Sequence, residues 1–164
     1  MISVKVHVNV NALNRFRSML EAGLNHAGPI GRAIDSWAAT YLGFLYGRYK
    51  AEGYGDWPPL ARSTIRKKGH TTILRDTDTL MEAFNPDTAS FIAQPIHGGV
   101  RIDINTAGTH PSGHPIATLL GFHQEGMGNN PTREVVVSPP QNVVEKLVSD
   151  LDKAVKETKL MSGS

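Results

Sequence analysis

Three histidines in one stretch of the chain have spacings that suggest a metal site. His110 and His114 are four residues apart, which would place both imidazoles on one face of a helix, and His123 and Glu125 follow. However, Pro-Ser-Gly separates the first two and a proline comes next, so this segment cannot be helical. We therefore expect solvated loop histidines and no bound metal. A metal-dependent hydrolase that uses His110, His114 and His123 remains the third hypothesis for the function.

Other catalytic motifs are missing from the sequence. It contains no Gly-x-Ser-x-Gly elbow, and its Ser, His and Asp residues are scattered without a recognisable local arrangement. The glycines at 53 and 55 follow a helical pattern and precede Trp-Pro-Pro, whereas a phosphate-binding loop lies between a strand and a helix. The chain has no cysteine, which excludes thiol nucleophiles, disulfides and Cys-based metal sites. The sequence thus predicts neither an enzyme nor a cofactor.

Basic side chains gather in the middle of the chain, and they could contact phosphates. The cluster consists of Arg62, Arg66, Lys67, Lys68 and, a little further on, Arg75. Phosphate contacts of this kind give affinity that depends on salt and not on base sequence. The cluster lacks the interleaved aromatic residues of a single-strand binder, and no helix–turn–helix pattern is evident. A small DNA-binding module that uses the basic N-terminal half is therefore the second hypothesis, and a solvated loop is the simpler interpretation.

The charge of the chain is unevenly distributed. Residues 1–75 contain 11 Lys or Arg and 4 Asp or Glu, a net charge of +7. Residues 76–164 contain 6 and 11, a net charge of −5, so the whole chain has a net charge of +2. Such asymmetry is compatible with a nucleic-acid face, and equally with a head-to-tail contact between the basic part of one subunit and the acidic part of the next.

The length and composition of the sequence suggest a single folded domain. The 164 residues, 40% of them hydrophobic, suit one domain over 1–160 with a flexible tail over 161–164. No stretch reaches the roughly 18 apolar residues of a membrane-spanning helix, and the N-terminus alternates from the start instead of forming a signal peptide. We therefore expect a soluble protein that is made and used inside a cell and has no membrane partner.

The apolar pattern predicts a mixed α+β fold. Alternating residues predict a strand over 2–10, and helical spacing predicts long helices over 11–24 and from residue 30 to about Gly53. Ser138 should cap a C-terminal helix with Pro139 at its first position. We expect an antiparallel sheet of three to four strands packed against two long helices and the C-terminal helix. The remaining predicted elements are short helices over 63–68, 77–84 and 116–124, a hairpin of strands over 89–93 and 100–104, and a strand over 134–138.

Three stretches of the chain carry a resemblance to a known family. The first stretch, residues 57–68, contains Trp57-Pro58-Pro59-Leu60, Thr64 and Lys67-Lys68. The second stretch, residues 73–80, reads Ile73-Leu74-Arg75-Asp76-Thr77-Asp78-Thr79-Leu80. The third stretch, residues 122–133, contains Phe122-His123-Gln124-Glu125-Gly126 and then Asn130-Pro131-Thr132-Arg133. In this order and at these separations they resemble the phage virion-morphogenesis or tail-completion family, which includes the Mu-like G and P2-like S tail proteins.

The chain departs from the family pattern at three places. Asp78 stands where the family favours Gly, Leu119-Leu120 replaces a Tyr-Ala pair, and Glu134-Val135 replaces Pro-Phe after Arg133. The resemblance still spans about residues 30–155, and it depends on the spacing and order of the motifs more than on any rare residue.

The resemblance implies a structural protein of the virion of a tailed phage or prophage. Family members are thought to form rings at the head-proximal end of the tail, where they complete the tail or join it to the head connector. The implied partners are other copies of the chain in a hexamer or dodecamer, neighbouring neck or tail proteins, and DNA in the channel. Assembly would take place in the host cytoplasm. The resemblance does not separate tail completion from a tail terminator or another neck role.

Roles for individual residues follow from the resemblance. Trp57, Leu60, Leu74 and Leu80 would anchor the irregular middle of the chain onto the core, and Thr64 and Pro131 are further motif positions. His123 and Gly126 would shape the turn after a short helix, and Arg133 would pair with an acid in its own or a neighbouring subunit. The basic cluster would face a partner ring or the DNA channel.

Overall fold

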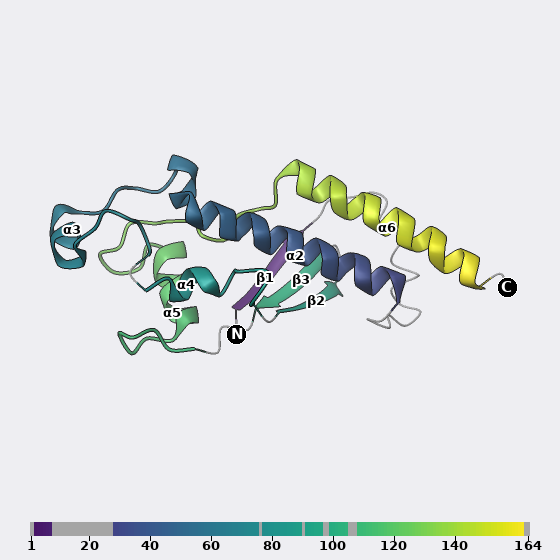
Figure 1. Ribbon diagram of the computed structural model, residues 1–164, viewed down its shortest axis with the longest axis horizontal. Coiled ribbons are helices and arrows are strands. Elements are labelled where there is room, and N and C mark those ends of the chain that lie inside the picture. Colours follow the sequence, from purple (N-terminus) through teal and green to yellow (C-terminus); the bar gives the residue numbers. More distant parts are fainter. Residues whose placement is uncertain are drawn as a thin grey trace. The chain divides into compact units, whose positions relative to one another are not determined.

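The computed structural model describes residues 2–7, 28–75, 77–89, 91–96, 99–104 and 108–162, and it has the mixed α+β architecture that the sequence predicts (Figure 1). The chain divides into two compact units, each made of separate stretches. Unit 1 comprises Met1–Ile2, Leu42–Ser90 and Ile104–Val137, and unit 2 comprises Ser3–Tyr41, Phe91–Asp103 and Ser138–Ser164. Neither unit is a continuous piece of sequence, and the prediction of one domain over 1–160 stays a prediction.

The longest helix of the first half, α2 (Pro29–Lys50), contributes residues to both units. Pro29 suits the first helical position because proline lacks the N–H that would be unpaired there. Buried residues recur three or four apart along the helix, at Ile34, Trp37, Tyr41 and Leu45. The helix ends at Lys50, three residues before the predicted end, and is followed by the short 3-10 helix η1 (Glu52–Gly55).

The sheet belongs mainly to unit 2. It consists of β1 (Ile2–His7), β2 (Phe91–Ile96) and β3 (Gly99–Ile104), in the spatial order β1-β3-β2. Only two residues separate β2 from β3 in the sequence, and neighbouring strands with so short a connection must be antiparallel. The predicted hairpin is therefore confirmed, although its first strand covers Phe91–Ile96 instead of 89–93. The last residues of the predicted first strand and the predicted helix over 11–24 lie outside the described residues.

Unit 2 also contains the C-terminal helix α6 (Gln141–Ser162), which lies beside the N-terminal part of α2 (Figure 1). The Trp37 indole Nε1 donates a hydrogen bond of 2.8 Å to the Val143 carbonyl oxygen, and its ring stacks on Tyr41 with centroids 5.8 Å apart. The C-terminal helix is confirmed, but it begins two residues later than predicted. The carbonyl oxygen of Pro140 accepts its first backbone hydrogen bonds.

Three short helices lie in unit 1: α3 (Arg62–Lys68), α4 (Thr79–Glu82) and α5 (Ile116–Gln124). All three confirm predicted short helices, although α4 is shorter than the predicted range. Helices α4 and α5 pack against each other. The core of unit 1 centres on Tyr49, whose ring meets Trp57 edge-on at 5.4 Å and stacks on Phe84 at 6.3 Å.

The strand predicted over 134–138 is wrong, because these residues form an irregular segment. The Gln124 side chain occupies the backbone groups that a strand partner would use. Its Oε1 accepts hydrogen bonds of 2.9 Å from the N–H groups of Val135 and Val136, and its Nε2 donates to the Val136 carbonyl oxygen. A fourth strand at this position is thereby excluded, although Val135 is buried as a core strand residue would be.

Among the described residues, the helices are too short or too polar for any of them to cross a membrane.

Candidate functional site

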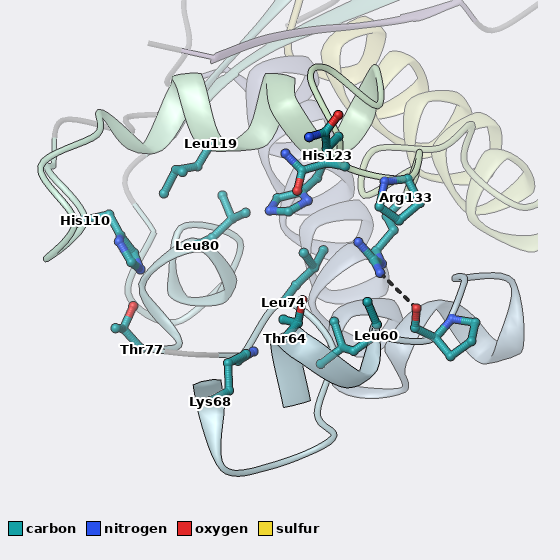
Figure 2. Close-up of a pocket in the computed structure, with 15 residues that line it drawn as sticks. Leu60, Thr64, Lys68, Leu74, Thr77, Leu80, His110, Leu119, His123 and Arg133 are labelled. Carbon is teal, nitrogen blue, oxygen red and sulfur yellow. Dashed lines mark hydrogen bonds between the residues drawn. The ribbon is translucent and has the colours of Figure 1, made fainter. Parts of the chain in front are cut away.

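A pocket of about 410 Å³ in unit 1 gathers residues from all three stretches that carry the family resemblance (Figure 2). Its walls come from α3, the segment before α4, α4 itself, α5 and the loop that follows α5. The predicted site residues that line it are Leu60, Thr64, Lys68, Leu74, Leu80, His123, Pro131 and Arg133. We treat this pocket as the candidate site.

Leucines form the apolar part of the pocket wall. Leu80 on α4 and Leu119 on α5 point toward one another, and Leu60 and Leu74 contribute from the first and second stretches (Figure 2). Leu74 has a positive φ of 56°, and its carbonyl oxygen accepts a hydrogen bond of 3.4 Å from the Tyr49 hydroxyl. The buried aromatic core thus holds the second stretch against the pocket.

Arg133 connects the third stretch to the first. Its Nε and one terminal nitrogen donate hydrogen bonds of 3.2 and 3.0 Å to the Pro58 carbonyl oxygen. The same terminal nitrogen lies 3.4 Å from the Pro59 oxygen (Figure 2). Among the described residues the side chain has no ion pair with a carboxylate and contacts two carbonyl oxygens instead. The acidic partner in its own or a neighbouring subunit stays a prediction. Arg133 is only 4% exposed, and burial lowers the pKa of its guanidinium.

Trp57 lies outside the pocket and anchors the first stretch to the core, as predicted. Its indole Nε1 donates a hydrogen bond of 3.1 Å to the Glu134 carbonyl oxygen. Arg48 of α2 donates to the same oxygen at 3.4 Å and also to the Gly53 carbonyl oxygen and the Asp56 carboxylate, at 3.1 and 3.0 Å. Sequence reasoning missed Arg48, because its position on α2 gave no sign that its side chain is buried.

The three histidines of the metal hypothesis do not come together. His110 and His123 line the pocket, whereas the His114 ring packs edge-on against Phe122 with centroids 6.1 Å apart. His110 Nδ1 lies 2.7 Å from the Ser112 hydroxyl oxygen. Within the described ranges, no group of three or more His, Asp or Glu side chains is arranged to hold a metal ion.

His123 interacts electrostatically with two cationic groups of the pocket, Arg133 and Lys68. Its Nδ1 is buried and has no hydrogen-bond partner among the described residues. Burial, together with the positive charges of Arg133 and Lys68, lowers the pKa of the imidazole from 6.5 to about 4. The ring is therefore neutral at physiological pH and acts as an uncharged wall of the pocket.

We expect the lowered pKa of His123 to make the protein sensitive to acid. The unfolded chain binds a proton on this ring near pH 6.5, whereas the folded chain resists protonation until about pH 4. The contribution of neutral His123 to the free energy of unfolding is complete above pH 6.5 and is lost as the pH falls through about 4. After allowance for the partial exposure of the ring, this loss is on the order of 2 kcal/mol. Urea unfolding at several pH values checks this loss. His123→Gln should flatten the pH dependence in this window, and an unchanged slope in the variant would contradict the assignment.

The basic cluster divides in the structure. Lys68 lines the pocket, and its Nζ donates a hydrogen bond of 3.1 Å to the Thr72 carbonyl oxygen. Arg75 forms an ion pair with Asp78 at 2.8 Å. The other members of the cluster, Arg62, Arg66 and Lys67, are exposed on α3. The predicted cluster thus separates into a residue that lines the pocket, a residue that is ion-paired with Asp78, and three exposed basic residues on α3.

Asp78, the departure from the family pattern, adopts a backbone conformation that favours glycine. Its φ of 54° and ψ of 0° lie in the left-handed region. Aspartate tolerates this region better than most residues. The hydrogen bonds from Arg75, of 2.8 and 3.2 Å, hold the carboxylate and lower its pKa. Asp78 therefore has a backbone conformation that glycine adopts more easily than other residues do.

We expect Asp78→Gly to be tolerated better than Asp78→Ala. Glycine removes the left-handed strain of roughly 1 kcal/mol while losing an exposed ion pair worth roughly 0–1 kcal/mol, so the net change should be small. Alanine loses the same ion pair and keeps the strain. In thermal or urea unfolding, the free energy of unfolding of the glycine variant should exceed that of the alanine variant by about 1 kcal/mol. The reverse order would show that left-handed strain does not limit stability at this position.

The turn after α5 depends on Gly126 as predicted. This glycine has a φ of 66°, and an added Cβ would lie 2.5 Å from the Thr132 hydroxyl oxygen. This turn reverses the direction of the chain, so that the Arg133 N–H donates a 2.7 Å hydrogen bond to the His123 carbonyl oxygen.

Scans against protein-family models, curated protein sequences and solved structures find no match to this chain.

Proposed function

We propose that the chain is a structural virion protein of a tailed phage or prophage, acting in tail completion or head–tail joining. The observation that carries this proposal is the contact between the first and third stretches. Arg133 binds the carbonyl oxygens of Pro58 and Pro59, and Trp57 binds that of Glu134. Motif residues about 75 positions apart in the sequence therefore belong to one hydrogen-bonded unit. Such an arrangement supports the interpretation of these stretches as parts of a single family pattern.

The departure at position 78 also supports the proposal. A tail-completion pattern with Gly at this place requires a backbone that glycine adopts easily, and Asp78 has that backbone with its φ of 54°. The substitution is thus the kind that a family member can accept. The finer parts of the proposal, a hexameric or dodecameric ring at the head-proximal end of the tail, come from the resemblance alone.

The mass of the purified protein in solution tests the proposed role. We expect a closed ring at high concentration and low salt, because a ring uses two different surface patches on each subunit and the halves of the sequence have opposite charge. Light scattering and native mass spectrometry measure the subunit number. A chain that stays monomeric under these conditions, alone and with its neighbouring tail proteins, would overturn the proposal.

The exposed basic surface of α3 favours DNA binding as a second candidate function. Arg62 and Arg66 are one helical turn apart and therefore share a face, and Lys67 adds a third exposed positive charge. A titration against duplex DNA at several salt concentrations separates the candidates. Micromolar or tighter binding that weakens steeply with salt, and weakens further in Arg62→Ala and Arg66→Ala, favours the DNA-binding module. Ring formation without such binding favours the virion role.

A further inference from the structure

The candidate pocket combines an aliphatic wall with positive charge. Four leucines line it, and none of the described residues at its wall is acidic. Its ionisable lining groups are Lys68, Arg133 and the two histidines, His110 and His123. A pocket of about 410 Å³ has the size of sites that enclose a small molecule or a few side chains.

No described residue of the pocket wall is acidic, and the Asp78 carboxylate, which interacts electrostatically with Lys68, is ion-paired with Arg75. Arg133 is almost fully buried, and its hydrogen bonds go to uncharged carbonyl oxygens. The Lys68 ammonium has three N–H groups, and its hydrogen bond with a described residue, Thr72, uses one of them. Figure 2 shows the Lys68 side chain reaching along α3 toward the space between Thr64 and Thr77. An anionic group that entered this space would meet Lys68, and no described acidic residue of the wall would have to be displaced.

We propose that this pocket binds an acidic side chain flanked by aliphatic residues, carried by a segment of a partner protein. The carboxylate would lie near Lys68 and Arg133, and the flanking aliphatic groups would lie against Leu60, Leu74, Leu80 and Leu119. An aliphatic occupant accounts for the leucine wall, since such groups bury apolar surface against leucine. A nucleic-acid strand fits less well, because the described lining residues include no Phe, Tyr or Trp on which a base could stack.

This inference names a partner surface for the proposed assembly role without depending on the ring. A peptide can bind unit 1 of a monomer, and a ring can form through other surfaces. Peptide binding and subunit number are therefore measured separately, and either can fail while the other succeeds.

The test uses two acetylated, amidated tripeptides, Leu-Glu-Leu and Leu-Gln-Leu, which differ only in one carboxylate. Binding is followed by the NMR signals of the His110 and His123 imidazoles in the full chain. We expect Leu-Glu-Leu to shift these signals and to bind about tenfold more tightly than Leu-Gln-Leu. Equal binding of both peptides, or no binding of either, overturns the inference without the need for any variant.

Two charge-neutral variants on the same helix locate the site. Lys68→Met removes the pocket ammonium, and Lys67→Met removes an exposed charge that does not line the pocket. We expect Lys68→Met to weaken Leu-Glu-Leu binding several-fold and Lys67→Met to change it less than twofold. Equal weakening by both variants would indicate general attraction to a basic surface. Competition by inorganic phosphate or duplex DNA as strong as by Leu-Glu-Leu would indicate a phosphate site and would overturn the assignment to a carboxylate.

Discussion

Trp57→Ala is expected to lower the free energy of unfolding by about 4 kcal/mol, the largest effect we predict for a single substitution. The indole is 5% exposed, and it packs edge-on against Tyr49 at 5.4 Å. The ring also lies close to the backbone of Gly53, where an added Cβ would be 2.6 Å from it. Truncation would therefore leave a large cavity, because Tyr49 and the Gly53 turn are held by other contacts and cannot collapse fully. It would also leave the Glu134 carbonyl oxygen with the long hydrogen bond from Arg48.

Two variants separate packing from hydrogen bonding at this position. Trp57→Phe keeps an aromatic ring but removes the Nε1 donor, and we expect it to cost about 1–2 kcal/mol. Tyr54→Ala, in the same segment but at a side chain that is 62% exposed, should change stability by less than about 0.5 kcal/mol. Unfolding in urea is followed by circular dichroism, since removing Trp57 alters the fluorescence. A loss below about 2 kcal/mol for Trp57→Ala would show that the segment does not depend on this anchor.

Trp37 makes it possible to follow the two units separately. In the Trp57→Phe variant, Trp37 is the remaining tryptophan, and it lies in unit 2. If its fluorescence transition coincides with the circular-dichroism transition, the units unfold together. If it does not, the destabilisation is confined to unit 1, and a single free energy of unfolding no longer describes the chain.

The elements that the sequence predicts correctly are those whose buried residues recur at the regular spacing of a helix or a strand. The buried positions of α2 recur at helical spacing, and β3 alternates between Val100, Ile102 and Ile104 on one side. Periodicity detects such elements because one face packs and the other does not. The run Glu134-Val135-Val136-Val137 has the same local appearance as a strand. Its partner is the Gln124 side chain, a contact that no periodicity in the sequence reveals.

The candidate site was predicted residue by residue but not as a pocket. The spacing of the motifs indicated Leu60, Leu74, Leu80 and Arg133, but not that they line one space. Two features of the fold bring them together, and both depend on distant contacts. The Gly126 turn returns the third stretch toward the first, and the buried Tyr49 side chain holds Leu74 in a left-handed conformation. His110 belongs to the same pocket, although the sequence predicts a solvated loop histidine there and, in the third hypothesis, a metal ligand.

Arg133→Ala is expected to lower the free energy of unfolding by about 3 kcal/mol. The variant loses the hydrogen bonds that join the third stretch to the Pro58 and Pro59 carbonyl oxygens, and it leaves those oxygens without their partner in a partly buried place. Relief of the desolvation of the buried guanidinium offsets part of this cost, which is why the expected loss is not larger. Urea unfolding monitored by circular dichroism measures it.

Arg133→Lys tests whether stability at this position depends on the geometry of the guanidinium or only on its positive charge. A lysine keeps the positive charge but lacks the planar fork that places two donors on the Pro58 oxygen and reaches the Pro59 oxygen. We therefore expect Arg133→Lys to recover less than half of the stability lost in the alanine variant, and Arg62→Ala, at an exposed residue of α3, to lose less than about 0.5 kcal/mol. Full recovery by lysine would mean that a positive charge is enough at this position. In that case the contact between the first and third stretches would not depend on the guanidinium geometry, and the main support for the proposed function would be weakened.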